Sequence, residues 1–270
     1  NACVEVDGSA YWMSENGFFR YAGKLESLPC LVEDHVYDDI NLESGNQMVS
    51  AGLNNLFGEV IWFYPTSSSS VVNRMVAYNY FDSIPQRPVW TVGTLARTMW
   101  RDSAIFGKPH ALEYDADTDT SFDVVGNTEG RTTYYEHETG TDQVKGGTVT
   151  AITANILSGD FDITQRIVGN QMTGIADFRG DGENIMKIRR FIPDFISQTG
   201  DTRVTLNLRN FPSDTASSSS LGPFTITSST SKVDTRARAR AIALKIENTS
   251  TSQSWKLGTF RLDTQPDGRR

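Results

Sequence analysis

The most regular chemical pattern in the sequence is the alternation Arg-Ala-Arg-Ala-Arg-Ala over residues 236–241. Successive side chains of a β-strand point to opposite faces, so Arg236, Arg238 and Arg240 would share one face of a strand. Such a row could bind phosphates, meet carboxylates of a neighbouring subunit, or protect an exposed strand edge from aggregation. We favour the edge or the interface, and treat Arg236, Arg238 and Arg240 as subunit-interface candidates.

A second pattern places aspartates at alternate positions, Asp115, Asp117 and Asp119, with Asp123 following. Calcium-binding loops present their oxygens in this way. The EF-hand pattern fails, however, because its sixth position is Thr120 instead of glycine and its twelfth is Gly126 instead of glutamate. We therefore interpret the segment as a solvated acidic loop, and the sequence predicts no metal site.

Residues that could support catalysis do not form a recognisable motif. The pairs Glu33-Asp34 and Asp38-Asp39, and Asp160 with Asp162, could in principle provide the acid and base of glycoside hydrolysis, but carboxylates are the commonest solvated charges. No zinc-protease, serine-hydrolase or nucleotide-binding motif occurs in the sequence. The three histidines also belong to no catalytic motif, and we expect them at surface or half-buried positions: His35, His110 and His137. The sequence thus predicts neither a catalytic residue nor a cofactor.

The elements that carry these residues are predicted to be almost all strands. Apolar segments are short, rich in aromatic and β-branched residues, and end at Gly, Asn, Asp, Ser or Pro. Asn16-Gly17 between two aromatic runs predicts a hairpin turn. One short helix is expected over residues 32–42, where apolar side chains recur at helical spacing. Strands are expected at 59–64, 74–80, 89–92, 96–100, 133–138, 149–157, 185–192, 203–211, 224–226, 232–236, 242–247 and 254–262.

The spacing of the strands predicts two regions. Residues 1–148 repeat an aromatic strand, a turn and a second strand, which favours a partial β-propeller-like region with one short helix. Residues 149–270 have longer alternating strands joined by polar loops, which favours an antiparallel β-sandwich. The predicted fold class is all-β.

Composition narrows the class of protein. The 270 residues include 25 basic and 33 acidic side chains, and the net charge of −8 argues against a non-specific nucleic-acid binder. No apolar stretch is long enough for a membrane helix. Cys3 and Cys30 have no metal-binding spacing and are expected to stay reduced as small apolar residues.

Several segments, in the same order along nearly the whole chain, resemble one family: the tail nozzle or tail hub (DNA-stabilising tail accessory) proteins of short-tailed bacteriophages. The matching segments are 12–13, 17–23, 28–30, 57–65, 76–80, 95–100, 190–194, 255–258 and 261–270; the last reads Arg-Leu-Asp-Thr-Gln-Pro-Asp-Gly-Arg-Arg. Because proteins of this family are typically longer and the sequence does not start with Met, we expect it to be the C-terminal portion of one.

The resemblance implies a non-enzymatic virion protein of the phage tail, assembled in the host cytoplasm. It implies a homo-oligomer, expected to be a hexameric ring, that joins the portal, the adaptor and other tail proteins. Double-stranded DNA would pass through the ring without sequence-specific binding. The residues alone leave two other classes open, a carbohydrate-binding or carbohydrate-cleaving β protein and a cellular β-propeller scaffold.

Overall fold

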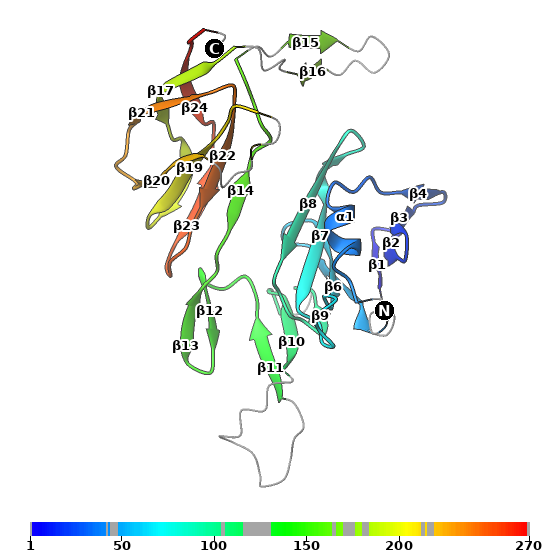
Figure 1. The fold of residues 1–270 in the computed structure, drawn as a ribbon. Coiled ribbons are helices and arrows are strands. Elements are labelled where there is room, and N and C mark those ends of the chain that lie inside the picture. The colour runs from blue at the N-terminus through cyan, green and yellow to red at the C-terminus, as the bar shows by residue number, and fades with distance from the viewer. Residues whose placement is uncertain are drawn as a thin grey trace. The chain divides into compact units, whose positions relative to one another are not determined.

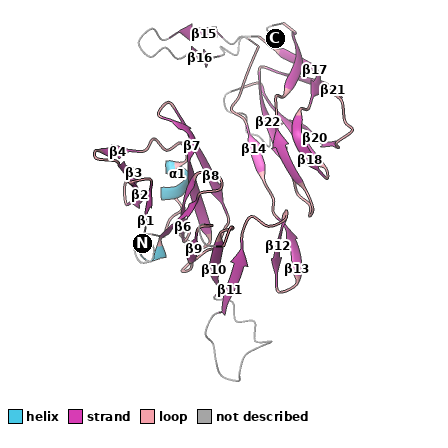
Figure 2. Ribbon diagram, turned by 180° about the vertical axis from the view of Figure 1, so that it is seen from behind, coloured by secondary structure: helices cyan, strands magenta, loops and turns pink. Residues whose placement is uncertain are grey.

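The computed structural model describes residues 2–41, 43, 48–103, 106–115, 131–163, 166–169, 176–179, 184–211, 214 and 219–268. Strands dominate these residues, and every paired strand in them is antiparallel (Figure 2). The all-β prediction is therefore confirmed. The chain divides into two compact units, residues 1–139 and 140–270, whereas the boundary was expected after residue 148.

Unit 1 consists of three sheets in which consecutive strands are neighbours (Figure 1). The first contains β1 (Cys3–Val6), β2 (Ser9–Ser14), β3 (Gly17–Tyr21) and β4 (Leu25–Ser27). The second contains β5 (Ser50–Asn54), β6 (Glu59–Tyr64), β7 (Arg74–Ile84) and β8 (Arg87–Gly93). The third contains β9 (Met99–Arg101), β10 (His110–Asp115) and β11 (Arg131–Glu136). A four-stranded meander is the topology of a propeller blade, whereas the propeller itself stays a prediction.

The central sheet is buried on both faces. Along β6, Val60, Trp62 and Tyr64 pack into the core shared with the first sheet. The alternate residues Ile61 and Phe63 belong to a second core that also includes Trp100 of the third sheet. This explains why β6 is a continuous apolar run instead of an alternating one, as expected for a strand with both faces covered.

The helix is shorter than predicted. It is α1 (Glu33–Tyr37), and no side chain caps its N-terminus. A helix of five residues is marginal by itself, so packing has to stabilise it. Val36 is fully buried against the first and second sheets, and the Tyr37 hydroxyl donates to the carbonyl of Ser14 at 2.6 Å. Burial raises the pKa of Tyr37 to about 12.

The predicted hairpin of β2 and β3 is present, but its turn is formed by other residues. Ser14 pairs with Gly17, so the loop consists of Glu15 and Asn16 instead of Asn16-Gly17. The turn with positive φ at both positions is Asp7-Gly8, between β1 and β2, with φ of 48° and 77°. Asp-Gly is favoured there because type I′ turns need positive φ at both central residues.

Unit 2 contains two larger sheets and three two-stranded sheets. The four-stranded sheet has the order β14 (Asn155–Leu157), β22 (Ala241–Glu247), β19 (Thr202–Arg209) and β20 (Ser220–Ile226). The three-stranded sheet has the order β21 (Val233–Ala239), β17 (Met186–Ile192) and β24 (Arg261–Pro266). The pairs are β12 (Asp142–Lys145) with β13 (Thr148–Ala151), β15 (Arg166–Gly169) with β16 (Ala176–Arg179), and β18 (Phe195–Thr199) with β23 (Ser254–Leu257).

The two larger sheets share one core, the arrangement of a β-sandwich. Ile188 and Phe191 of β17 pack with Val204 and Leu206 of β19 and with Ile246 of β22. Two predicted strands are each divided: 149–157 into β13 and β14, and 254–262 into β23 and β24.

Candidate functional sites

The arginine row is only partly as predicted. Arg236 and Arg238 are exposed on β21, and the alanines between and after them are buried in the core. β21 is an edge of its sheet, as one interpretation of the row required. Arg240 does not continue the strand, because β21 ends at Ala239 and the chain crosses to the other sheet. The prediction of three arginines on one strand is therefore wrong for Arg240, whose amide donates to the carbonyl of Arg209.

Other basic residues lie beside this row. Pairing of β17 with β21 places Lys187 opposite Arg238, and β17 also contributes Arg189 and Arg190. The sequence-based interpretation missed these three residues. Their signal was the basic run 187–190, Lys-Ile-Arg-Arg, but only strand pairing shows that it lies next to β21.

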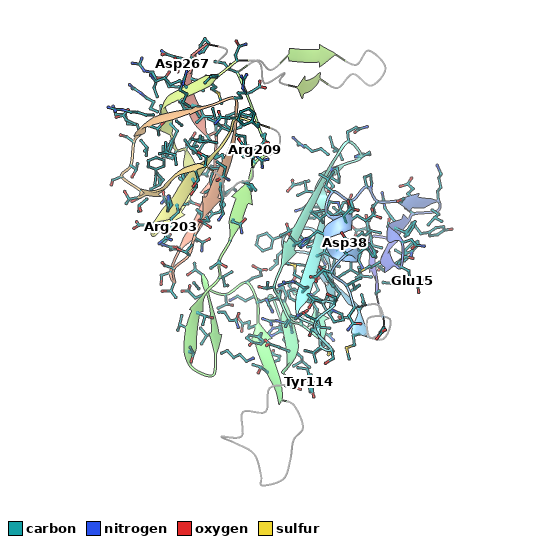
Figure 3. All side chains as sticks on the ribbon, in the orientation of Figure 1. Glu15, Asp38, Tyr114, Arg203, Arg209 and Asp267 are labelled. Carbon is teal, nitrogen blue, oxygen red and sulfur yellow. The ribbon has the colours of Figure 1, made fainter. Side chains whose placement is uncertain are left out.

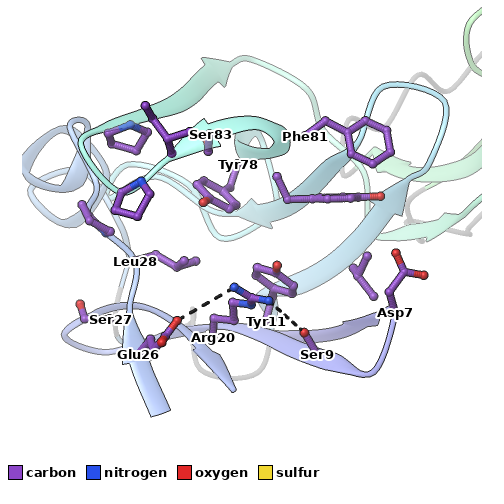
Figure 4. Close-up of a pocket in the computed structure, with 16 residues that line it drawn as sticks. Asp7, Ser9, Tyr11, Arg20, Glu26, Ser27, Leu28, Tyr78, Phe81 and Ser83 are labelled. Carbon is purple, nitrogen blue, oxygen red and sulfur yellow. Dashed lines mark hydrogen bonds and ion pairs between the residues drawn. The ribbon is translucent and has the colours of Figure 1, made fainter. Parts of the chain in front are cut away.

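A second candidate site is a pocket of about 630 Å³ between the first and second sheets of unit 1. Figure 4 shows Tyr11 from β2 and Tyr78 from β7 on facing walls, with their ring centroids 6.2 Å apart. The ring centroid of Tyr80 lies 6.3 Å from that of Tyr11, and the exposed Phe81 lies at the rim of the pocket. Aromatic walls with a few polar groups are typical of small-ligand sites.

Polar groups of the pocket come from the first sheet. The guanidinium of Arg20 lies 5.7 Å from the centre of the Tyr11 ring and donates to the Ser9 hydroxyl at 3.3 Å. Glu26 is 4.0 Å from Arg20, and Asp7, in the turn between β1 and β2, lies at the other end of the same sheet (Figure 4). Burial raises the pKa of Tyr11 above its ordinary value.

The third cluster is a buried ion pair in the last sheet of unit 1. Arg97, only 3% exposed, donates to Glu113 at 3.0 Å and to Nε2 of His137 at 2.9 Å. Its guanidinium also lies 3.9 Å from the centre of the Tyr135 ring. Burial, followed by the charge of Arg97, lowers the pKa of His137 to about 4. These contacts connect Arg97, Glu113, Tyr135 and His137 within one buried cluster.

The remaining candidates have ordinary surroundings. Asp160 forms an ion pair with Arg209 at 2.9 Å, and Asp39 lies 3.8 Å from Arg74. His110 contacts the hydroxyl of Tyr134. Apart from Asp115, which ends β10, the acidic segment 115–123 lies outside the described residues.

Cys3 is exposed and Cys30 is half-buried, and both are free thiols. The expectation that both pack as small apolar residues therefore fails for Cys3.

Two classes of site are absent from the part of the chain that the structure describes. It contains no group of three His, Cys, Asp or Glu side chains able to hold a metal ion. Within the same residues, no helix has the length and apolarity needed to cross a bilayer.

Comparison of the sequence with protein-family models finds no match, and comparison with curated proteins finds no similar chain.

Proposed function

We propose that the chain is a non-enzymatic structural component of a bacteriophage tail. It would form part of a nozzle or hub ring that extends the portal–adaptor channel and helps to retain and conduct packaged DNA. The observation that carries the proposal is a stack of three successive meanders whose first sheet has an apolar outer face. A stack of this kind is suited to continued packing against further sheets.

The outer face of the first sheet has aromatic and aliphatic side chains. Cross-strand pairing places Trp12 beside Phe19, and their rings stack with centroids 5.7 Å apart. In the next row, Tyr21 pairs with Leu25, and these side chains are 51% and 58% exposed. Contiguous apolar patches on a protein surface commonly mark association sites. We assign this face to a neighbouring subunit of a closed ring, formed by repeated heterologous contacts.

The charge of the chain supports the same role. A net charge of −8 disfavours adhesion of DNA to the chain as a whole, so contact with passing DNA would be confined to local groups of cations.

The proposal is tested by the oligomeric state of the purified chain, measured by sedimentation velocity and negative-stain electron microscopy. We expect closed rings, and we expect Phe19→Ser combined with Tyr21→Ser to release folded monomers. Phe211→Ser is the control, because Phe211 is an aromatic residue that is even more exposed (66%) but lies in unit 2. A wild-type chain that stays monomeric at high concentration, and that does not join portal–adaptor complexes, would refute the proposal.

Carbohydrate binding is the second candidate, and the tyrosine pocket is the observation that favours it. Sugars need an aromatic surface together with paired polar groups, and this pocket provides Tyr78 and Phe81 with Arg20, Glu26 and Asp7. A glycan-array signal that Phe81→Ala abolishes would support this function. An array without signal would remove it.

A further inference from the structure

The outer face of the three-stranded sheet in unit 2 contains a basic concavity of about 490 Å³. Three adjacent features form it: the exposed side of β21, the exposed side of β17, and the bulge between them. Its lining residues are Lys187, Arg189, Arg190, Asp234, Thr235, Arg236 and Arg238. Five of these seven residues are cations, in a chain whose net charge is −8.

A β-bulge concentrates this charge. The register of β17 shifts between Ile188 and Arg190 against both neighbours: Arg189 is an extra residue relative to β24, whereas on the other side Thr235 and Arg236 of β21 oppose the single residue Arg189. Ile188 and Phe191 are both in the core, whereas Arg189 is exposed and Arg190 is half-exposed. Regular alternation would have directed Arg190 inward, and bulges are known to redirect side chains in this way. Two consecutive arginines thus lie on the outer face.

The sheet neutralises this charge only in part. Arg190 lies 3.6 Å from Asp234 and 3.5 Å from Asp263. Arg238 is 2.5 Å from Asp267, the residue labelled beyond β24 in Figure 3. Among the described residues, Lys187, Arg189 and Arg236 have no ion pair or hydrogen bond.

The arrangement also carries an electrostatic cost. Lys187 faces Arg238 directly across the β17–β21 pair, and like charges in that position destabilise a sheet. A fold that places cations together at such a cost, and gives three of them no partner among the described residues, has the character of an anion-binding site.

We propose that this concavity binds the phosphates of double-stranded DNA without reading its sequence. Four of the five cations are arginines, whose forks match phosphate geometry, and protein–DNA interfaces are far more positive than protein–protein interfaces. The cluster therefore fits a phosphate backbone better than the carboxylates of a second copy. The inference deepens the proposed function, and rests on it for the choice of DNA as the polyanion.

The test measures binding of the full chain to a fluorescein-labelled duplex of ~20 base pairs, about two helical turns, by fluorescence anisotropy at increasing salt. With three phosphate contacts, the logarithm of the binding constant should fall against the logarithm of salt with a slope of about −2.7. A fourfold rise in salt would then weaken binding about 40-fold. Arg236→Ser should reduce the slope by about 1, and Arg236→Lys should preserve it.

A triple variant and a charge-matched control distinguish binding by the cations of the concavity from binding that depends only on the net charge of the chain. Lys187→Ser/Arg189→Ser/Arg236→Ser should abolish the salt-dependent binding. Lys24→Ser/Arg87→Ser/Arg101→Ser removes the same charge from exposed positions of unit 1 and should leave binding unchanged. Circular dichroism checks that both variants fold, and the single Arg236→Ser variant decides the question if the triple variant does not.

Three results would overturn the inference. The first is absence of duplex binding, including the case in which inorganic phosphate alone binds. The second is an equal loss of binding in the unit 1 control. The third is a triple variant that loses ring assembly but binds the duplex as tightly as the wild-type chain, which would assign the cations to a second copy. Rings without duplex binding would refute this inference alone, whereas duplex binding by a permanent monomer would refute the proposed function.

Discussion

Removing the carboxylate partner of Arg97 is the most demanding test of how unit 1 is held together. The side chains of Arg97 and Glu113 are 4% and 14% exposed, with the interacting atoms 3.0 Å apart. Glu113→Gln keeps the shape of the side chain but removes its charge. The guanidinium would then remain buried without a counter-ion, because its other contacts are a carbonyl, a neutral histidine and an aromatic ring.

The expected loss follows from the burial of the pair. Breaking a buried ion pair by removing one partner costs about 3–5 kcal/mol. We take about 3 kcal/mol, because the glutamine oxygen can still accept from Arg97. With a urea slope of about 2 kcal/mol per molar, the midpoint of unfolding should fall by about 1.5 M. Replacing both partners, Arg97→Met with Glu113→Leu, should cost less than the single change, since no buried charge is left behind.

Urea titration followed by tryptophan fluorescence measures this loss. Four of the five tryptophans are in unit 1, and Trp100 lies 4.6 Å from His137, within the cluster. Glu136→Gln is the control, because Glu136 pairs with Lys108 in the same sheet but is exposed, and exposed pairs contribute little. The reasoning is refuted if Glu113→Gln shifts the midpoint no more than Glu136→Gln, or if the double variant is the least stable of the three.

Three further predictions concern other residues of unit 1. The pKa of His137 is about 4 in the fold and about 6.5 when unfolded. Its contribution to stability is therefore complete above pH 6.5 and is lost as the pH falls toward 4. In the His137→Gln variant the urea midpoint should depend less on pH over that range, and an NMR titration midpoint above 6 for His137 would contradict the prediction. Gly52→Ala should destabilise unit 1 by about 1–3 kcal/mol, since a Cβ would lie 2.5 Å from the Trp100 ring; an unchanged thermal midpoint would show that the third sheet can move away at no cost. Ellman's reagent at pH 8 should modify Cys3 quickly and Cys30 slowly, because burial raises the pKa of Cys30 to about 11; equal rates would contradict this.

Local sequence predicted the strands well where one strong pattern extends through a segment. β6 has exactly the expected bounds, 59–64, because an uninterrupted apolar run ended by proline has few alternatives. The predictions failed where the pattern was weak or ambiguous. The strand expected at 149–157 is instead two strands, β13 and β14, with residues 152–154 between them.

In the candidate sites, the residues that could be predicted from the sequence are more sharply separated from those that only the tertiary structure brings together. The alternation of arginine and alanine by itself determined that Arg236 and Arg238 would be exposed while their neighbours enter a core, because a strand has a period of two. Only the tertiary structure decided which cations join them, since Lys187, Arg189 and Arg190 are about 50 residues away in the sequence and reach the site through register and a bulge. Arg97, Glu113 and His137 likewise carry no common motif, and burial alone turns three ordinary residues into one electrostatic unit.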